Sequence, residues 1–183
     1  MHRSLIDTFD SRQLQPESNS IAGAWVLDLS RSDTMEGYLR CMQVPDVGIA
    51  AQVAGERENE SLNLIAIEGT TLTVHKRTKI NNFTESFELN REKVTPTKHG
   101  VRRCTVSFQD GSPDVFFVSA TTLTPEGVVQ LEEVRRLLEG GLVHSQELRV
   151  LNASTGGQNV TRRTWVRAPM TEQHQASLLS LSR

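Results

Sequence analysis

Arg163 lies near the end of the chain, in a segment where polar and apolar residues alternate. Successive side chains of a strand point to opposite faces, so Arg163 shares a face with Thr161 and Trp165. We expect the tryptophan to lie on the apolar, enclosed face. A guanidinium there is costly unless it is paired, and its planar fork suits a carboxylate. The acid belongs either to a ligand or to a side chain such as Glu133 or Glu147, unless Arg163 faces solvent.

Catalytic and metal-binding patterns are missing from the sequence. The five histidines show no His-x-x-x-His or Cys-His spacing, and no nucleophile elbow, phosphate loop or dinucleotide fingerprint occurs. We expect His75 and His144 to be structural and Cys41 and Cys104 to be packing thiols without a disulfide. The sequence therefore predicts no catalytic residues, no metal and no cofactor, and a protein that is not an enzyme.

Composition excludes further classes of function. The 183 residues carry 20 Lys and Arg against 22 Asp and Glu, and only 5% of them are aromatic. This balance disfavours a nucleic-acid-binding protein. There is no apolar run of membrane-spanning length and no apolar secretion signal after Met1, so we expect a cytoplasmic protein.

Most of the chain consists of short alternating segments separated by turns that often contain glycine. Turns at such short spacing are typical of a meander barrel rather than of βαβ units. A weaker segment surrounds Val94. The other predicted strands of this part are residues 62–67, 71–77, 83–89, 101–109, 115–118, 128–136, 142–151 and 159–167.

The start of the chain differs from this pattern. Residues 23–29 alternate as a strand does, but residues 35–42 and 47–54 have helical spacing. We expect Ser32 or Asp33 to cap the first helix and Gly55 to end the second. Two short helices cannot form a core of their own, so they are predicted to close one end of a barrel.

These segments resemble the opening of the intracellular lipid-binding proteins, the family of fatty-acid-binding and retinoid-binding proteins. In that family a Gly-x-Trp strand precedes a helix-turn-helix lid. Lipocalins share Gly-x-Trp, but not the helical hairpin that follows it here. The matching runs are Gly23-Ala24-Trp25-Val26-Leu27, Met35-Glu36-Gly37-Tyr38-Leu39, Val47-Gly48-Ile49-Ala50, Ile67-Glu68-Gly69, residues 79–87 and Arg163-Thr164-Trp165-Val166-Arg167-Ala168.

The resemblance implies an all-β fold with a helix-turn-helix lid, a ten-stranded up-and-down β-barrel or β-clam of the calycin, lipocalin-like type. It covers residues 21–169. Residues 1–20 and 170–183 lie outside it and are expected to be flexible extensions, because both are polar.

The resemblance also implies a ligand site. In the family, an Arg on the last strand, a Tyr two residues later and an Arg two strands earlier hold the carboxylate of the ligand. Arg163 and Arg135 match the two arginines, whereas Trp165 replaces the tyrosine. An indole can donate a hydrogen bond but cannot accept one, so the headgroup geometry is expected to differ or the cavity to be partly filled.

The lid supplies the other candidate ligand-binding residues. Met35, Leu39, Ile49 and Val53 are expected to face the barrel mouth, and Ile80 falls where the family often has a portal phenylalanine.

The function implied is binding and transport of long-chain fatty acids or similar anionic lipids by a monomer. The lid would make transient membrane contact, and the terminal extensions could meet a protein partner. The alternative is an interaction or structural module of the same fold with a reduced or occupied cavity. A secreted lipocalin-like carrier and an enzyme are less favoured.

Overall fold

The protein is seen in a computed structural model that describes residues 20–58, 60–78, 82–109, 112–124, 127–169 and 171. Ten strands form within these ranges. They are β1 (Gly23–Leu27), β2 (Leu62–Glu68), β3 (Thr71–Arg77), β4 (Asn82–Glu88), β5 (Lys93–Thr97), β6 (Gly100–Phe108), β7 (Val115–Thr124), β8 (Gly127–Leu138), β9 (Val143–Asn152) and β10 (Gly157–Ala168).

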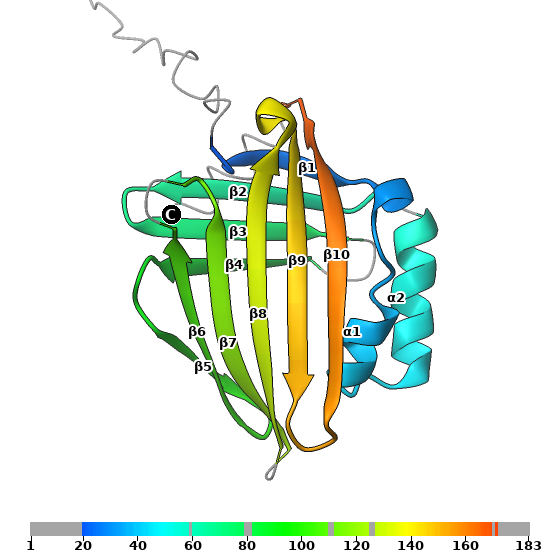
Figure 1. The fold of residues 1–183 in the computed structure, drawn as a ribbon. Helices are drawn as coiled ribbons and strands as arrows, with labels where there is room; N and C mark the ends of the chain where they lie inside the picture. The colour runs from blue at the N-terminus through cyan, green and yellow to red at the C-terminus, as the bar shows by residue number, and fades with distance from the viewer. Residues whose placement is uncertain are drawn as a thin grey trace, which may run out of the picture.

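All ten strands belong to one antiparallel sheet with the order β4-β3-β2-β1-β10-β9-β8-β7-β6-β5. Strand β1 pairs with the last strand, with Trp25 opposite Arg167 and Leu27 opposite Trp165. Every other neighbouring pair joins strands that are consecutive in the chain. The sheet curls so that β2 to β4 cross behind β6 to β10 (Figure 1). The predicted ten-stranded up-and-down barrel is confirmed.

The barrel is nearly but not fully closed, because among the described residues no backbone ladder joins the two edge strands β4 and β5. Side chains bridge this seam instead. Lys93 Nζ of β5 donates to the carbonyl oxygen of Ser86 in β4 at 2.9 Å. Arg102 Nη1 of β6 lies 2.9 Å from both carboxylate oxygens of Glu85 in β4.

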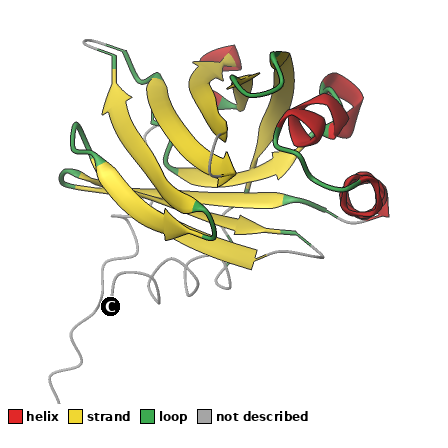
Figure 2. Ribbon diagram, turned by 90° about the horizontal axis from the view of Figure 1, so that it is seen from below, coloured by secondary structure: helices red, strands yellow, loops and turns green. Residues whose placement is uncertain are grey.

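Two helices, α1 (Glu36–Cys41) and α2 (Asp46–Glu58), lie between β1 and β2 in the chain. Figures 1 and 2 show them side by side at one end of the barrel, next to β10. Asn152 Nδ2, at the end of β9, donates to the carbonyl oxygen of Cys41 at 2.8 Å. This bond ties the end of α1 to the barrel. None of the helices in the described ranges combines the length and apolarity needed to cross a bilayer.

The predicted helix boundaries were wrong in two respects. Helix α1 follows Met35 without a side-chain cap, because the Asp33 carboxylate accepts a hydrogen bond from the Arg162 backbone N–H of β10 instead. Helix α2 continues through Gly55 to Glu58. A glycine inside a helix costs only about 1 kcal/mol relative to alanine, which the contacts of this helix offset.

The main core cluster surrounds Trp25, whose indole N–H donates to the Ile21 carbonyl oxygen at 2.8 Å. Leu72, Val106 and Val115 are buried with it. Val74, Phe87 and Phe117 of the same cluster border a cavity that Tyr38 of α1 lines as well.

Candidate functional site

Two adjoining cavities of about 330 Å³ each lie inside the barrel. They share six lining residues, which come from α1 and the residue that precedes it, and from β3, β4 and β9. These residues are Met35, Tyr38, Lys76, Phe83, Gln146 and Leu148. Both apolar and polar side chains thus line the space, as is usual for a site that binds a small molecule.

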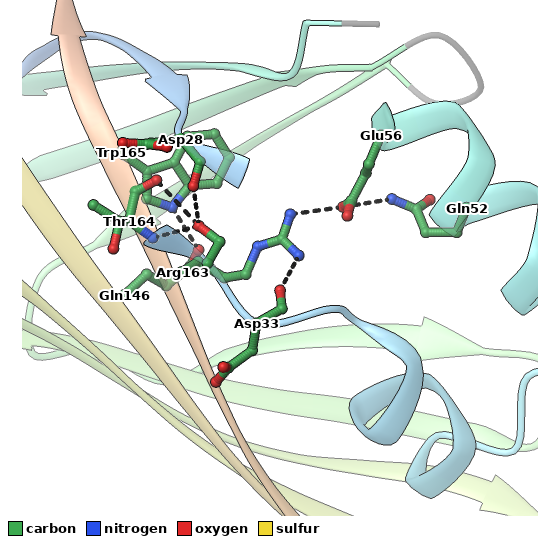
Figure 3. A network of polar contacts seen from close by, with 9 residues as sticks. Asp28, Asp33, Gln52, Glu56, Gln146, Arg163, Thr164 and Trp165 are labelled. Atoms are coloured by element: carbon green, nitrogen blue, oxygen red, sulfur yellow. Dashed lines mark hydrogen bonds and ion pairs between the residues drawn. The ribbon is translucent and has the colours of Figure 1, made fainter. Parts of the chain in front are cut away.

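Arg163 points into the barrel, as strand alternation predicts, and only 3% of its side chain is exposed. Its Nη2 lies 2.9 Å from Glu56 Oε1 of helix α2, and its Nη1 donates to the Asp33 carbonyl oxygen at 2.9 Å. Gln52 Nε2 also donates to Glu56 Oε1, at 3.0 Å (Figure 3). The guanidinium of the last strand is therefore paired with an acid of the lid.

Arg135 of β8 is also buried, and its Nε lies 2.5 Å from Glu133 Oε1. Glu133 Oε1 accepts a second hydrogen bond, from Gln146 Nε2 at 2.8 Å. The Arg135 guanidinium carbon lies 5.3 Å from the centre of the Phe117 ring. Its Nη1 is buried and has no hydrogen-bond partner among the described residues.

Trp165 completes this chain of polar contacts. Its indole N–H donates to Gln146 Oε1 at 3.0 Å, so the amide bridges Trp165 and Glu133. The tryptophan lines only the second cavity. The indole N–H of Trp165 is thus already used in a hydrogen bond within the protein.

In this structure Arg135 and Arg163 are both paired with acids of the protein, as the alternative interpretation of the sequence expected. Glu133 is one of the two acids expected for this role. Glu147 is not, because it pairs with Arg149 and Arg162 on the outer face. Glu56 was missed, since it lies beyond the glycine at which the second helix was expected to end. The direct binding of a ligand by Arg163 and Arg135 stays a prediction.

Lys76 is a second interior residue that the sequence reasoning missed. It lies on β3 two residues after Val74 and four after Leu72, both buried, so alternation could have placed it inside. Its side chain lines both cavities, and its Nζ lies 5.8 Å from the centre of the Phe83 ring. No carboxylate of the described residues lies within 4.0 Å of Nζ. Burial lowers the pKa of Lys76, and the nearby charge of Glu133 opposes this in part.

The predicted lid residues divide into three groups. Met35 lines both cavities and Leu39 lines the second. Ile49 is buried and Val53 is half-buried, but neither lines either of these two cavities. Ile80 lies outside the described residues. Tyr38, which was not predicted, points from α1 toward both cavities. Burial, with a smaller contribution from Glu133, raises its pKa to about 12, so its phenol is a neutral donor.

The charged side chains that line the two cavities do not balance. The carboxylates are Glu56, Glu85 and Glu133, whereas the cations are Lys76, Arg102, Arg135 and Arg163. Each arginine is paired with one of the carboxylates. Within the described part of the interior, Lys76 is the cation that remains.

Solved structures show the same arrangement of strands and helices. A REP1-NXSQ fatty acid transporter superposes with a TM-score of 0.62 and 16% identity, over 82% of this chain and 97% of that one. A Schistosoma mansoni fatty acid binding protein in complex with arachidonic acid gives a TM-score of 0.60 and 13% identity, over 84% and 100%. The chain has the fold of the fatty-acid-binding proteins.

A third structure with this fold is apo lipid binding protein 8 of Caenorhabditis elegans, with a TM-score of 0.59 and 19% identity, over 80% of this chain and 94% of that one. No family model and no curated protein sequence matches the chain. The resemblance stated from the sequence is therefore confirmed as a likeness of fold.

His144 lies at the core end of this fatty-acid-binding-protein-like barrel. It is fully buried, and neither ring nitrogen has a hydrogen-bond partner in the described part of the chain. Its ring centre lies 4.7 Å from that of Trp25 and 5.9 Å from that of Trp165. Burial, followed by the charges of Arg135 and Arg167, holds the pKa of His144 well below its usual value. A neutral imidazole between two indoles has a packing role.

The described residues contain no cluster of three or more His, Cys, Asp or Glu side chains arranged to hold a metal ion. Cys41 and Cys104 are both free thiols, and burial raises the pKa of each. Raised pKa values make a thiolate nucleophile unfavourable.

Proposed function

We propose that the protein binds a long-chain fatty acid or a similar anionic lipid inside the barrel and carries it through water. The observation that supports this most is the interior itself, in which apolar side chains and an excess of cations surround two adjoining cavities beneath a helical lid. One of the solved structures with this fold is in complex with arachidonic acid.

Burial of the acyl chain supplies the main favourable term in this proposal. Each methylene removed from water contributes about 0.8 kcal/mol. A carboxylate loses its hydration in the same step, and interior cations offset that cost. Arg163 is paired with Glu56, so direct contact of the headgroup with Arg163 competes with that acid. Arg135 is paired with Glu133 through Nε, whereas its buried Nη1 has no hydrogen-bond partner among the described residues.

Entry of the ligand requires movement of the lid in this proposal. Met35 and Leu39 come from the segment around α1 and lie over the cavities, where an acyl chain would pass them. We further propose that the carrier acts as a monomer in the cytoplasm and touches membranes transiently through the lid. The terminal segments 1–20 and 170–183 remain candidates for contact with a protein partner.

Displacement of a fluorescent long-chain fatty acid from delipidated protein tests the proposal. Wild-type protein should bind the probe saturably at one site and release it to unlabelled acid. Ser119 of β7 lines the first cavity, so Ser119→Phe should fill the space and weaken binding at least about tenfold. Val118→Phe is the matched control, since Val118 is exposed on the outer face of the same strand. No saturable binding by wild-type protein would refute the proposal.

The alternative of an interaction module has one observation in its favour. Three of the four interior cations are already neutralised by carboxylates of the protein. A native mass spectrum of protein purified from its own cells separates the two functions. A carrier should retain a lipid, whereas the module should retain a protein partner that is lost when residues 1–20 are deleted.

A further inference from the structure

The interior charges point to one position for an acid headgroup. Arg102, Arg135 and Arg163 each have a carboxylate partner, whereas Lys76 has none within 4.0 Å among the described residues. We propose that the headgroup of the ligand binds at Lys76, and that this lysine makes the barrel select acids over neutral lipids of the same chain length. This inference rests on the proposed function and specifies its site.

The position of Lys76 suits this role. It lies on β3 between Asn63 of β2 and Phe83 of β4, and its side chain borders both cavities. By surface area it is only half-buried, because it faces the cavity space. The wall and lid around it lower the pKa of its ammonium group through desolvation. A carboxylate at Nζ would relieve that cost, because an enclosed charge is far less unfavourable when it is paired.

The charged groups that face Lys76 come from three other elements. Glu133 and Arg135 lie on β8, Arg163 on β10 and Glu56 on α2, and all four affect its pKa. Both carboxylates are already in contact with their arginines. The Lys76 ammonium is therefore attracted to two acids that are bound elsewhere.

A ligand carboxylate that displaced a protein carboxylate from its arginine would not make the interior more neutral. A ligand carboxylate that replaced Glu56 at Arg163 would leave the Glu56 carboxylate unpaired in a site where only 10% of it is exposed. The number of unpaired interior charges would not fall. At Lys76 the same carboxylate adds a new ion pair and breaks none. The difference favours Lys76 because unpaired buried charges are costly.

The test compares one long-chain fatty acid with the alcohol of the same chain length. Lys76→Met removes the charge and nearly keeps the side-chain length. Affinity for the acid should fall at least about tenfold, because a hydrogen bond to a charged group is lost, while affinity for the alcohol should change less than about threefold. Lys76→Arg should keep the preference for the acid.

A matched control removes a paired cation together with its acid. The double variant Arg163→Met, Glu56→Gln should still prefer the acid over the alcohol, because it leaves Lys76 in place. Preference for the acid that survives Lys76→Met, or that disappears in the double variant, would overturn the inference. Lys76→Gln serves as a second variant if Lys76→Met does not fold, and it has the same expected result.

The pH dependence gives an independent measurement. Acid affinity of the wild type should decline as the pH rises through the lowered pKa of Lys76, whereas Lys76→Arg should keep its affinity to about pH 10. Equal decline in both proteins would contradict the inference. If wild-type protein binds neither acid nor alcohol, the proposed function fails. If it binds the acid and Lys76→Met binds it equally well, the site assignment alone fails.

Discussion

At the scale of single residues, His144 is a buried base that the fold keeps neutral. Neither of its nitrogens is bonded within the described chain, and desolvation together with two arginines lowers its pKa. An unfolded histidine takes up a proton near pH 6.5, whereas the folded one does not. The unfolded state therefore binds more protons below that pH, and stability must fall as the pH drops.

We predict that His144→Phe removes this part of the acid sensitivity. Between about pH 7.5 and about pH 5.5 the histidine should account for roughly 1.4 kcal/mol of lost stability in the wild type. Urea unfolding at the two pH values measures it. His99→Gln, at an exposed position, is the control and should behave as the wild type does. Identical pH dependence in wild type and His144→Phe would show that the imidazole is not responsible.

Local sequence patterns predicted the interior side chains of single strands, but they did not predict the ion pairs between distant elements. Arg163 and Trp165 follow from alternation, because the spacing of side chains along a strand is fixed by its geometry. Glu56, the ion-pair partner of Arg163, comes from a helix over a hundred residues earlier in the chain, and no local sequence pattern encodes that contact. Ion pairs across the barrel depend on how the sheet curls, which is a property of the whole fold.

At the scale of elements, α1 packs closely on β10 through a glycine. A Cβ atom on Gly37 would lie 2.3 Å from Asn159 Nδ2 and 2.9 Å from its Cγ. Asn159 cannot turn away freely, since its Oδ1 accepts a hydrogen bond from Thr161 Oγ1 at 2.6 Å. The glycine therefore sets the distance between the helix and the strand.

We predict that Gly37→Ala lowers the free energy of unfolding by about 1–2 kcal/mol, although alanine favours helix formation by about 1 kcal/mol over glycine. In an Asn159→Ala background the clash is absent, so the same substitution should stabilise the protein. Denaturant unfolding of the four proteins of this double-mutant cycle measures the change of sign. Stabilisation by Gly37→Ala in both backgrounds would contradict the close packing.

Helix α2 is fastened to the barrel by the pair between Glu56 and Arg163, both largely buried. We predict that Glu56→Gln costs about 3 kcal/mol, because it leaves a guanidinium unpaired in the interior. Adding Arg163→Met should recover part of this loss. The exposed pair between Arg40 and Asp46 is the control, and Asp46→Asn should cost less than about 1 kcal/mol. Equal losses in Glu56→Gln and Asp46→Asn would mean that the lid is not held by this pair.

At the scale of the whole molecule, the described strands leave a seam between β4 and β5, where side chains bridge the barrel in place of a backbone ladder. Glu85 holds it by accepting from Arg102 and lying 3.5 Å from Lys93 Nζ. We predict that Glu85→Gln speeds hydrogen exchange in β4 and β5 and lowers stability by about 1–3 kcal/mol. Glu88→Gln should have little effect, because Glu88 lies on the same strand as Glu85 but pairs at the surface with Arg91 of the following turn. If hydrogen exchange in β4 and β5 were unchanged in Glu85→Gln, Glu85 would not be what holds the two edge strands together.

The overall architecture could be predicted more fully than the ends of the individual strands and helices. Gly-x-Trp, the helical hairpin and the repeated turns indicate the barrel, because each reflects local geometry. Strand β7 extends to Thr124, well beyond the predicted residue 118, since pairing with β8 continues across polar residues. Helix α2 likewise passes its glycine. In both cases contacts with distant elements outweigh the local preference of the chain.

The proposed function requires that the barrel holds an acid headgroup in its interior. This can be measured by NMR with a long-chain fatty acid that is labelled with carbon-13 at the carboxyl group and added to delipidated protein. We predict one bound resonance whose carboxylate stays ionised to lower pH than it does in water, because an interior cation stabilises the charge. Absence of a bound resonance, or a carboxylate that titrates as it does in free solution, would contradict the claim.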